Sequence, residues 1–117
     1  MIFQEHHLEK IRDGVKTQTR RQKPKEDLRY TVGTVYRATE GGQAMFQTIE
    51  ECKDFVRVVN ITEEPLGDLT EEDADAEGGY NLEEFIDIWE EINGEWDPEE
   101  TVSVIEFEYQ SYHPSED

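Results

Sequence analysis

The stretch that decides the fold reads Asp13-Gly14-Val15-Lys16-Thr17-Gln18-Thr19-Arg20-Arg21. Apolar residues at Leu8 and Ile11 predict a short helix over residues 5–13, because they share one helical face. Gly14 can end that helix, since glycine adopts the left-handed conformation without steric cost. The β-branched residues that follow favour an extended or looped segment over residues 16–21. A short helix followed directly by an extended segment therefore opens the domain.

The same stretch lies at the centre of the only basic region in a strongly acidic chain. Residues 10–29 hold eight of the eleven Lys and Arg and three acidic residues, a formal charge of +5, whereas the 117 residues together carry −19. Cations gathered in this way are typical of a surface that binds phosphate. The acidity elsewhere has two interpretations, a halophilic surface adapted to a saline cytoplasm, which we favour, or a surface made for a basic partner.

Length and composition predict one folded domain. Hydrophobic residues make up 34% and charged residues 35%, but twelve aromatic residues at regular spacings argue against disorder. We expect the domain to span residues 1–110, with a loose tail at 111–117. Cys52 is the single cysteine, which fits a reducing cytoplasm. Because no signal peptide or membrane-spanning run is visible, we expect a cytoplasmic protein without a membrane partner.

Hydrophobic periodicity and helix caps predict an α+β domain. Strand-like segments cover residues 1–3, 30–39, 55–61 and 101–109. In the second of them Gly33 marks a turn or bulge before the strand proper at 34–39, and Gly41-Gly42 is a hairpin candidate. Residues 44–51 are ambiguous. The segment 55–61 is apolar on both faces, with Phe55, Arg57, Val59 and Ile61 on one and Val56 and Val58 on the other. A strand of this kind is expected in the middle of a sheet.

Two further helices are predicted from capping boxes. Thr70 precedes Asp73 by three residues at the start of a helix over 71–77, and Asn81 precedes Glu84 in the same way at the start of a longer helix that Gly94 ends. Trp89 lies on the apolar face of the longer helix, whereas Trp96 follows it in a loop, where it could stack on a base or, as we prefer, cover the edge of the core. We therefore predict a small β-barrel with two to three helices packed around it.

Lys16, Thr19 and Glu77 are the candidate catalytic residues. A threonine hydroxyl becomes a nucleophile when a base removes its proton, and a buried lysine can be that base because burial lowers its pKa. In a straight strand Lys16 and Thr19 would point to opposite faces, so the segment must bend if they are to cooperate. Glu77 ends a capped helix, where the helix dipole disfavours a carboxylate. The alternative is that all three are solvated surface residues without a chemical role.

Metal and cofactor sites are not expected. His6, His7 and His113 are too few and too irregularly spaced for a metal site, and Cys52 has no second cysteine with which to bind zinc. The glycines do not form a phosphate-binding loop or a nucleotide-binding fingerprint. We therefore predict no metal and no cofactor.

The motifs in their order along the chain resemble the ASCH domain family, relatives of the PUA fold associated with RNA. The sequence Gly-x-Lys-Thr-x-Thr-x-Arg is filled by Gly14, Lys16, Thr17, Thr19 and Arg21. The further similarities, which follow it almost to the end of the chain, are Tyr30-x-Val32-Gly33-x-Val35, the capped segment from Leu66 to Gly78, Trp89, Gly94-x-Trp96-x-Pro98 and Val104-x-Glu106-Phe107.

This resemblance implies a PUA-like β-barrel and a cleft, lined by the first motif, that binds RNA or a modified nucleoside. Small ASCH proteins that deacetylate N-acetylated cytidine use a Lys and a Thr of that motif and a Glu of the helix, which correspond to Lys16, Thr19 and Glu77. Residues expected to contact RNA or another ligand are Thr17, Arg20, Arg21, Lys23, Lys25 and Arg29.

Three functions remain open from the sequence. The chain binds RNA or a nucleoside, or it is an amidohydrolase of the N-acetylcytidine deacetylase type, or it is a regulatory interaction module without a ligand. A saline cytoplasm would favour close recognition in a pocket, because molar salt shortens the screening length to about 3 Å and weakens attraction to a phosphate backbone. The basic residues between 22 and 29 leave room for a polymer.

Overall fold

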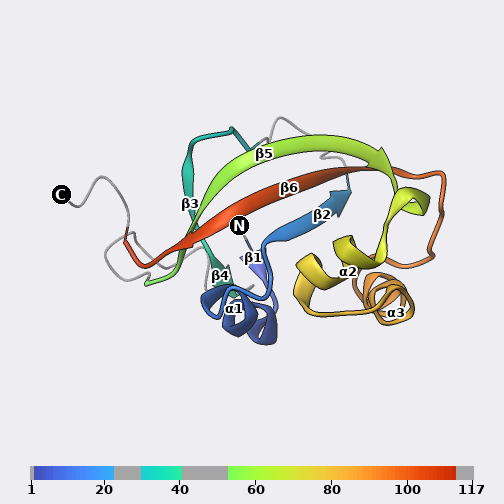
Figure 1. Cartoon of the computed structure of the whole chain (residues 1–117), viewed down its shortest axis with the longest axis horizontal. Helices are drawn as coiled ribbons and strands as arrows, with labels where there is room; N and C mark the ends of the chain where they lie inside the picture. Colours follow the sequence, from blue (N-terminus) through green and yellow to red (C-terminus); the bar gives the residue numbers. More distant parts are fainter. Residues whose placement is uncertain (1, 23–29, 41–52, 113–117) are drawn as a thin grey trace.

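The computed structural model describes residues 2–22, 30–40 and 53–112 (Figure 1). Six strands and three α-helices, with a 3-10 turn at Leu66–Asp68, occupy these residues: β1 (Ile2–Phe3), α1 (Glu5–Arg12), β2 (Gln18–Gln22), β3 (Val35–Arg37), β4 (Thr39–Glu40), β5 (Phe55–Pro65), α2 (Glu71–Gly78), α3 (Leu82–Asn93) and β6 (Thr101–Gln110). The predicted hairpin at Gly41-Gly42, the segment 44–51 and most of the tail 111–117 lie outside the described residues.

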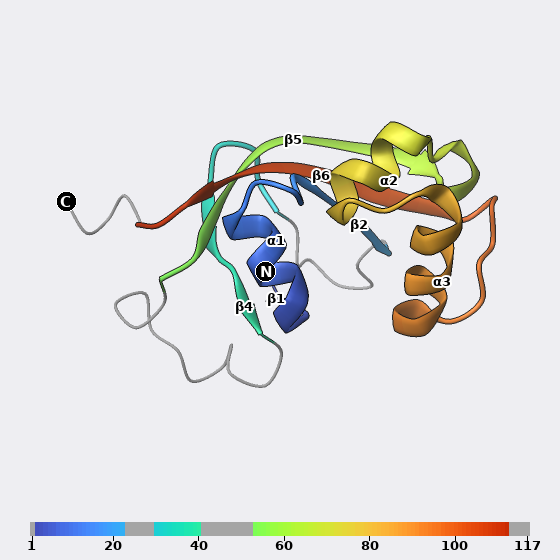
Figure 2. The ribbon, with the colours of Figure 1, turned by 60° about the horizontal axis from the view of Figure 1, so that its bottom comes forward.

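The main sheet contains four antiparallel strands in the order β2-β6-β5-β3. Its two long strands, β5 and β6, curl together, and β1 and β4 form a separate parallel pair (Figure 1). In both ribbon views α1 and α3 lie on the same side of the β5–β6 pair (Figure 2). The curled sheet, which forms a half-barrel, and its three helices confirm the predicted α+β fold of a small barrel with helices around it, and β5 has a neighbour on each side, as its apolar residues indicated.

The strands differ from the prediction in two places. The strand expected at 34–39 is divided into β3 and β4, because β5 begins at Phe55, opposite Arg37, and the chain beyond Arg37 pairs with β1 instead. In β5 a register shift between Val58 and Asn60 leaves Val59 exposed. This bulge resets the alternation, so the predicted face that joined Val59 to Phe55 is wrong, and the strand continues to Pro65.

The helix boundaries agree with the predicted capping residues. The Thr70 hydroxyl accepts a hydrogen bond from the Asp73 N–H at 3.1 Å while the Asp73 carboxylate accepts one from the Thr70 N–H at 3.0 Å, and Asn81 and Glu84 make the same reciprocal pair. Gly14 ends α1 with a φ of 76°, in the left-handed region. These fixed ends determine where the residues between the helices are placed.

The core consists mainly of two clusters. One packs α1 against the strands through Phe3, Leu8, Ile11, Ala38, Val56 and Phe107, and the other joins α2 and α3 to β6 through Leu66, Leu69, Ala74, Phe85, Trp89 and Val102. Trp96 lies edge-on to Phe85 and Trp89, with ring centroids 6.4 and 6.3 Å away, so it covers the edge of the core as preferred. No helix in the described part of the chain is long and apolar enough to cross a membrane.

Candidate functional site

A cavity of about 530 Å³ is lined by residues of α1, β2, α2 and α3. Its volume lies within the range of small-molecule sites. Apolar side chains form much of its wall: Phe3, Phe85, Ile88, Trp89 and Ile92. Polar and charged groups also reach it: Gln4, His7, Lys16, Thr19, Arg20, Arg21, Glu77, Tyr80 and Asn93. Apolar walls with a few convergent polar groups are the usual design of a ligand pocket.

Lys16 is buried in the wall of this cavity, with 4% of its side chain exposed. Its ammonium group donates to the backbone carbonyl oxygens of Gln18 at 3.0 Å and Glu77 at 2.8 Å, and it lies 3.5 Å from the Glu77 carboxylate. Burial lowers the pKa of Lys16 from its ordinary value, and the charge of Glu77 opposes that shift in part. Lys16 is therefore held in place by the main chain and is easier to deprotonate than a solvated lysine.

Glu77 lies at the end of α2 with 3% of its side chain exposed, and it links two buried cations. Its Oε2 accepts a hydrogen bond from Arg20 at 3.1 Å, while its Oε1 faces Lys16. Arg20 also pairs with Glu64 and, at 3.3 Å, with Asp73. Arg20 is thus joined to three carboxylates, and its buried guanidinium fixes the orientation of Glu77.

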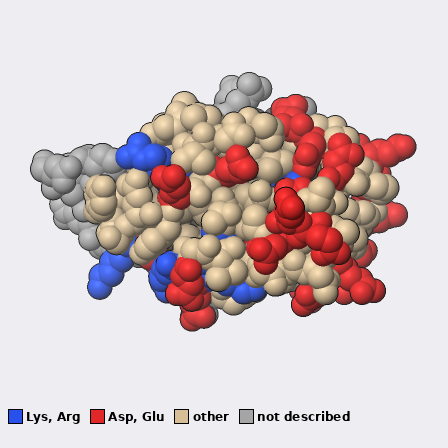
Figure 3. Space-filling view, viewed as in Figure 1, with Lys and Arg blue, Asp and Glu red and all other residues tan. Residues whose placement is uncertain are grey.

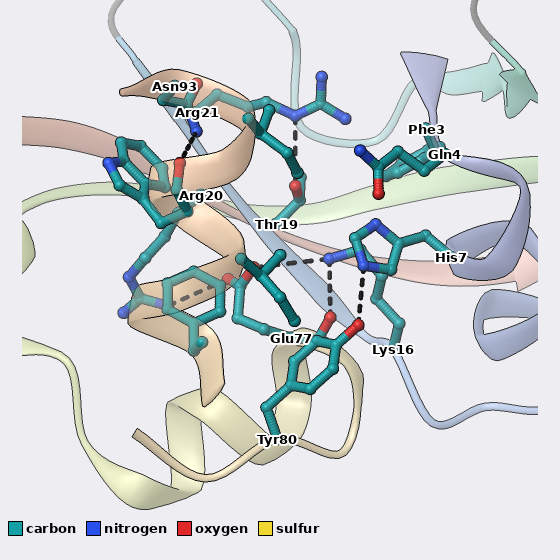
Figure 4. Close-up of a pocket in the computed structure, with 14 residues that line it drawn as sticks. Phe3, Gln4, His7, Lys16, Thr19, Arg20, Arg21, Glu77, Tyr80 and Asn93 are labelled. Carbon is teal, nitrogen blue, oxygen red and sulfur yellow. Dashed lines mark hydrogen bonds and ion pairs between the residues drawn. The ribbon is translucent and has the colours of Figure 1, made fainter. Parts of the chain in front are cut away.

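Thr19 and Arg21 complete the polar part of the cavity. The Arg21 Nε donates to the Thr19 hydroxyl at 3.2 Å, and the guanidinium lies 5.0 Å from the centre of the Phe3 ring. Figure 4 shows Lys16, Glu77, His7 and Tyr80 grouped at one end of the cavity, with Thr19 and Arg21 beside them. All three predicted catalytic residues therefore line one cavity, although the described contacts include no direct hydrogen bond between Lys16 and Thr19.

The chain bends before β2. Such a bend is required if the side chains of Lys16 and Thr19 are to reach the same site. The N–H of Lys16 still bonds to the Lys10 carbonyl of α1 at 3.1 Å, whereas the N–H of Thr17 bonds to the Ala76 carbonyl of α2 at 2.8 Å. Regular strand geometry begins only at Gln18. Lys16 and Thr19 are consequently both buried, while Thr17 between them is exposed and does not line the cavity.

The cations of the basic segment that the structure describes are bonded to other groups of the protein. Arg12 bonds to Asp54 through two hydrogen bonds of 2.9 and 2.6 Å, and Lys10 donates to the Gly78 carbonyl at 2.7 Å. Lys16 and Arg20 are buried, as described above. Figure 3 shows acidic side chains over the α2–α3 end of the molecule. The predicted ligand residues Lys23, Lys25 and Arg29 lie outside the described residues.

His7 and Tyr80 are two cavity residues that the sequence reasoning missed. His7 was considered only as a metal ligand, yet its Nε2 lies 2.9 Å from the Tyr80 hydroxyl at the cavity wall. A signal was present, because His7 stands four residues before Ile11 on the buried face of α1. Within the described ranges, no group of three His, Cys, Asp or Glu side chains is placed to hold a metal ion.

Comparison with solved structures supports this architecture, whereas comparison of the sequence with family models and curated proteins finds no match. Among solved structures, the chain is similar to an ASCH domain from Lactobacillus crispatus JV V101 with a TM-score of 0.62 and 16% identity, over 91% of this chain and 70% of that one. The chain has the fold of an ASCH domain.

A second structure of this fold extends the similarity. A protein from Enterococcus faecalis V583, described under the family model DUF984, matches with a TM-score of 0.67 and 16% identity, over 98% of this chain and 78% of that one. These matches confirm the resemblance to ASCH domains at the level of the fold. The ASCH fold alone does not determine which ligand the cavity takes, because one fold serves many functions.

Proposed function

We propose that the cavity binds a nucleoside, either free and modified or as a nucleotide of an RNA chain. The observation that carries this proposal is the cavity in which apolar and aromatic walls meet Lys16, Thr19, Arg21 and Glu77. A nucleobase is flat and apolar on its faces and has polar groups at its edge, so it requires this combination. The cavity volume of about 530 Å³ accommodates a ligand of that size.

The internal pairing of the described cations favours recognition of the base over recognition of the phosphate backbone. Backbone binding needs Lys and Arg side chains that can neutralise phosphates. Lys16 and Arg20 are instead buried against Glu77, and Arg12 is paired with Asp54. Hydrogen bonding inside a cavity also persists in high salt, where attraction to a polymer weakens.

Calorimetric titration with cytidine and N4-acetylcytidine tests this proposal. We expect saturable binding that is retained in molar KCl and weakened by Lys16→Met and by Thr19→Val. Thr17→Val is the matched control, because Thr17 lies on the same segment but is exposed and outside the cavity. A parallel titration with a short RNA at several salt concentrations measures backbone contacts. Equal affinity of Lys16→Met and the parent protein for every ligand would refute the assignment of this cavity.

Amidohydrolysis of an N-acetylated cytidine is the second candidate, and the burial of Lys16 beside Glu77 favours it. In this reaction neutral Lys16 takes the proton of the Thr19 hydroxyl, and the Thr19 oxygen attacks the acetyl carbon. The tetrahedral intermediate collapses with release of the protonated amine, the proton being returned through Lys16 or Glu77. Water then hydrolyses the acetyl–Thr19 ester, which yields acetate and restores the hydroxyl.

Two contacts suit that chemistry. The carbonyl oxygens of Gln18 and Glu77 can accept both N–H bonds of a neutral amine, so the lone pair of Lys16 is left for the incoming proton. Arg21 donates to the Thr19 oxygen, which leaves the hydroxyl hydrogen available for transfer. The lowered pKa of Lys16 raises the share of molecules in which the amine is neutral.

Release of acetate from N4-acetylcytidine, followed in molar KCl, tests the reaction. We expect Thr19→Ala and Lys16→Ala to abolish turnover with the fold intact, and Thr17→Ala to retain it. Thr19→Ser should keep part of the activity, because the nucleophilic hydroxyl remains. Absence of turnover by the parent protein would exclude this substrate while leaving nucleoside binding to be judged by the calorimetric titration.

A further inference from the structure

We propose that His7 and Tyr80 form an uncharged hydrogen-bonding pair that recognises the donor–acceptor edge of a nucleobase in the cavity. This inference rests on the proposed nucleoside site and specifies its ligand chemistry. Both side chains line the cavity, and the His7 Nε2 lies 2.9 Å from the Tyr80 hydroxyl oxygen. They come from α1 and from the segment between α2 and α3, so the fold brings together two residues 73 positions apart.

The surroundings of His7 keep its imidazole neutral. The side chain is buried, and the nearby charges that act on it come from Lys16, Lys10, Arg21 and His6. Burial, followed by these like charges, lowers the pKa of His7 from 6.5 to about 3. A neutral imidazole carries one N–H donor and one lone pair.

The pair retains one donor and one acceptor whichever way its internal hydrogen bond runs. If the Tyr80 hydroxyl donates to Nε2, the His7 Nδ1–H is a donor and the Tyr80 oxygen keeps a lone pair. If Nε2–H donates to Tyr80, the His7 Nδ1 is an acceptor and the Tyr80 hydroxyl donates onward. In the described structure the His7–Tyr80 bond is the one side-chain hydrogen bond of either residue. The remaining donor and acceptor are thus free for a ligand.

Tyr80 is held firmly enough to make this recognition specific. The Lys10 ammonium lies 4.0 Å from the centre of the Tyr80 ring and also donates to the Gly78 carbonyl. A Cβ atom on Gly78 would lie 2.7 Å from the Tyr80 ring, so the close packing of these two residues requires glycine. A group fixed before binding loses little conformational freedom when the ligand arrives.

An uncharged donor–acceptor pair selects a particular class of ligand. The pairing edges of cytosine and uracil each place an N–H donor next to an acceptor, and the two arrangements of the pair match either order. A ligand edge with acceptors alone leaves the acceptor of the pair without a partner. We therefore assign a nucleoside whose base keeps an intact donor–acceptor edge as the ligand class, and the pyrimidine nucleosides are its smallest members.

Binding of uridine, cytidine and 3-methyluridine to the full chain tests the assignment, because the methyl group of 3-methyluridine removes the ring N–H donor. The parent protein should bind uridine about tenfold more tightly than 3-methyluridine, because the loss of one hydrogen bond usually weakens affinity by about that factor. Tyr80→Phe and His7→Leu should each weaken uridine binding by about tenfold and remove the preference over 3-methyluridine. His6→Gln is the matched control, since His6 is exposed, neighbours His7 and does not line the cavity.

The outcomes separate this inference from the proposed function. The role of the pair is overturned if Tyr80→Phe binds nucleosides as tightly as the parent protein does. It is also overturned if the parent protein binds uridine and 3-methyluridine equally. Either result leaves the cavity as a nucleoside site. Failure of the parent protein to bind any of the three nucleosides overturns both. Tyr80→Phe removes a single oxygen atom, so it decides the matter even if His7→Leu does not fold.

Discussion

Two groups of polar and charged residues, each containing one or more cations of the basic segment, differ in their surroundings: one lines the cavity and the other lies at the protein surface. The cavity group consists of Lys16, Arg20 and Glu77, whose side chains are 4% exposed or less and line the cavity. The outer group consists of Arg12, Asp54 and Tyr109, and the Arg12 side chain is 47% exposed. In both, a cation from residues 10–29 is bonded to a carboxylate from a distant part of the chain.

This difference in surroundings indicates which of the two groups belongs to a ligand site. Asp54 accepts hydrogen bonds from Arg12 and from the Tyr109 hydroxyl at 2.9 Å, so the outer group ties α1 to the sheet. The cavity group brings buried charges together at a place that a ligand can reach, although buried charges are costly to desolvate. Charged residues kept at such a place are candidates for function, whereas the outer group has a sufficient structural explanation.

The largest contrast is expected from removing the carboxylate of each group. Glu77→Ala leaves Lys16 and Arg20 without their shared partner in a buried position and should lower the free energy of unfolding by about 3–5 kcal/mol. Asp54→Ala should cost about 1 kcal/mol, because its partner Arg12 is accessible to solvent. Urea denaturation of the two variants measures both values. Equal losses would remove the distinction between the groups.

The alkaline pH dependence of stability should come from the cavity group. Because the pKa of Lys16 is lower in the folded protein than in the unfolded chain, the unfolded chain binds more protons at pH values between the two. Stability should therefore rise with pH as 10.5 is approached, and Lys16→Met should remove that rise. Arg12→Met should preserve it. Thermal melts from pH 7 to 10 provide the comparison, and a rise that persists in Lys16→Met would show that another group causes it.

On acidification, the stability contributed by His7 in the cavity should be lost at a higher pH than the stability contributed by Asp54 in the outer group. His7 has its pKa lowered to about 3, so the stability it contributes is complete above pH 6.5 and is lost as the pH falls toward 3. Asp54 has its pKa lowered below 3.8, chiefly by Arg12, so its contribution is lost only at lower pH. Melting curves of His7→Gln should be flatter than those of the parent between pH 6.5 and 4, and His6→Gln should match the parent. An unaltered slope in His7→Gln would contradict the burial of a neutral imidazole.

Salt should produce the smallest effect. In 1 M KCl the screening length is about 3 Å, so the partly exposed Arg12–Asp54 pair weakens while the buried Arg20–Glu77 pair does not. The destabilisation caused by Asp54→Ala should shrink on adding KCl, and that caused by Glu77→Gln should stay constant. Urea denaturation at low and high KCl measures the change. A salt-sensitive loss in Glu77→Gln would place the cavity group in contact with solvent.

Local signals in the sequence predicted most elements of the fold. The capping boxes at Thr70 and Asn81 and the helix stop at Gly14 are decided by neighbouring residues, and each is found where expected. The division of the strand at 34–39 depends on where β5 begins, and the bulge at Val59 depends on the pairing of β5 with β6. Such features are set by contacts between distant segments, which periodicity alone does not contain.

The site was predictable only in part, because local motifs indicate some of its residues while contacts between distant segments place the others. Lys16, Thr19 and Glu77 were chosen by motif and chemistry, and they do line one cavity. Arg20, an expected ligand residue, also lines the cavity, but its bonds to three carboxylates from other elements are tertiary contacts that the sequence did not indicate. The spacing of His7 to Ile11 places His7 on the buried face of α1, but its contact with Tyr80 arises because α1 lies against the segment that joins α2 to α3, which no local pattern indicates.

The most direct test of the central claim is a titration of the isotopically labelled full chain with cytidine, followed by the chemical shifts of its backbone amides. Binding in the cavity predicts saturable shifts at Lys16, Thr19, Glu77 and Tyr80, with Asp54 and Tyr109 of the outer group unaffected. Absence of saturable shifts, or shifts centred on the outer group, would contradict the claim that this cavity is a nucleoside site.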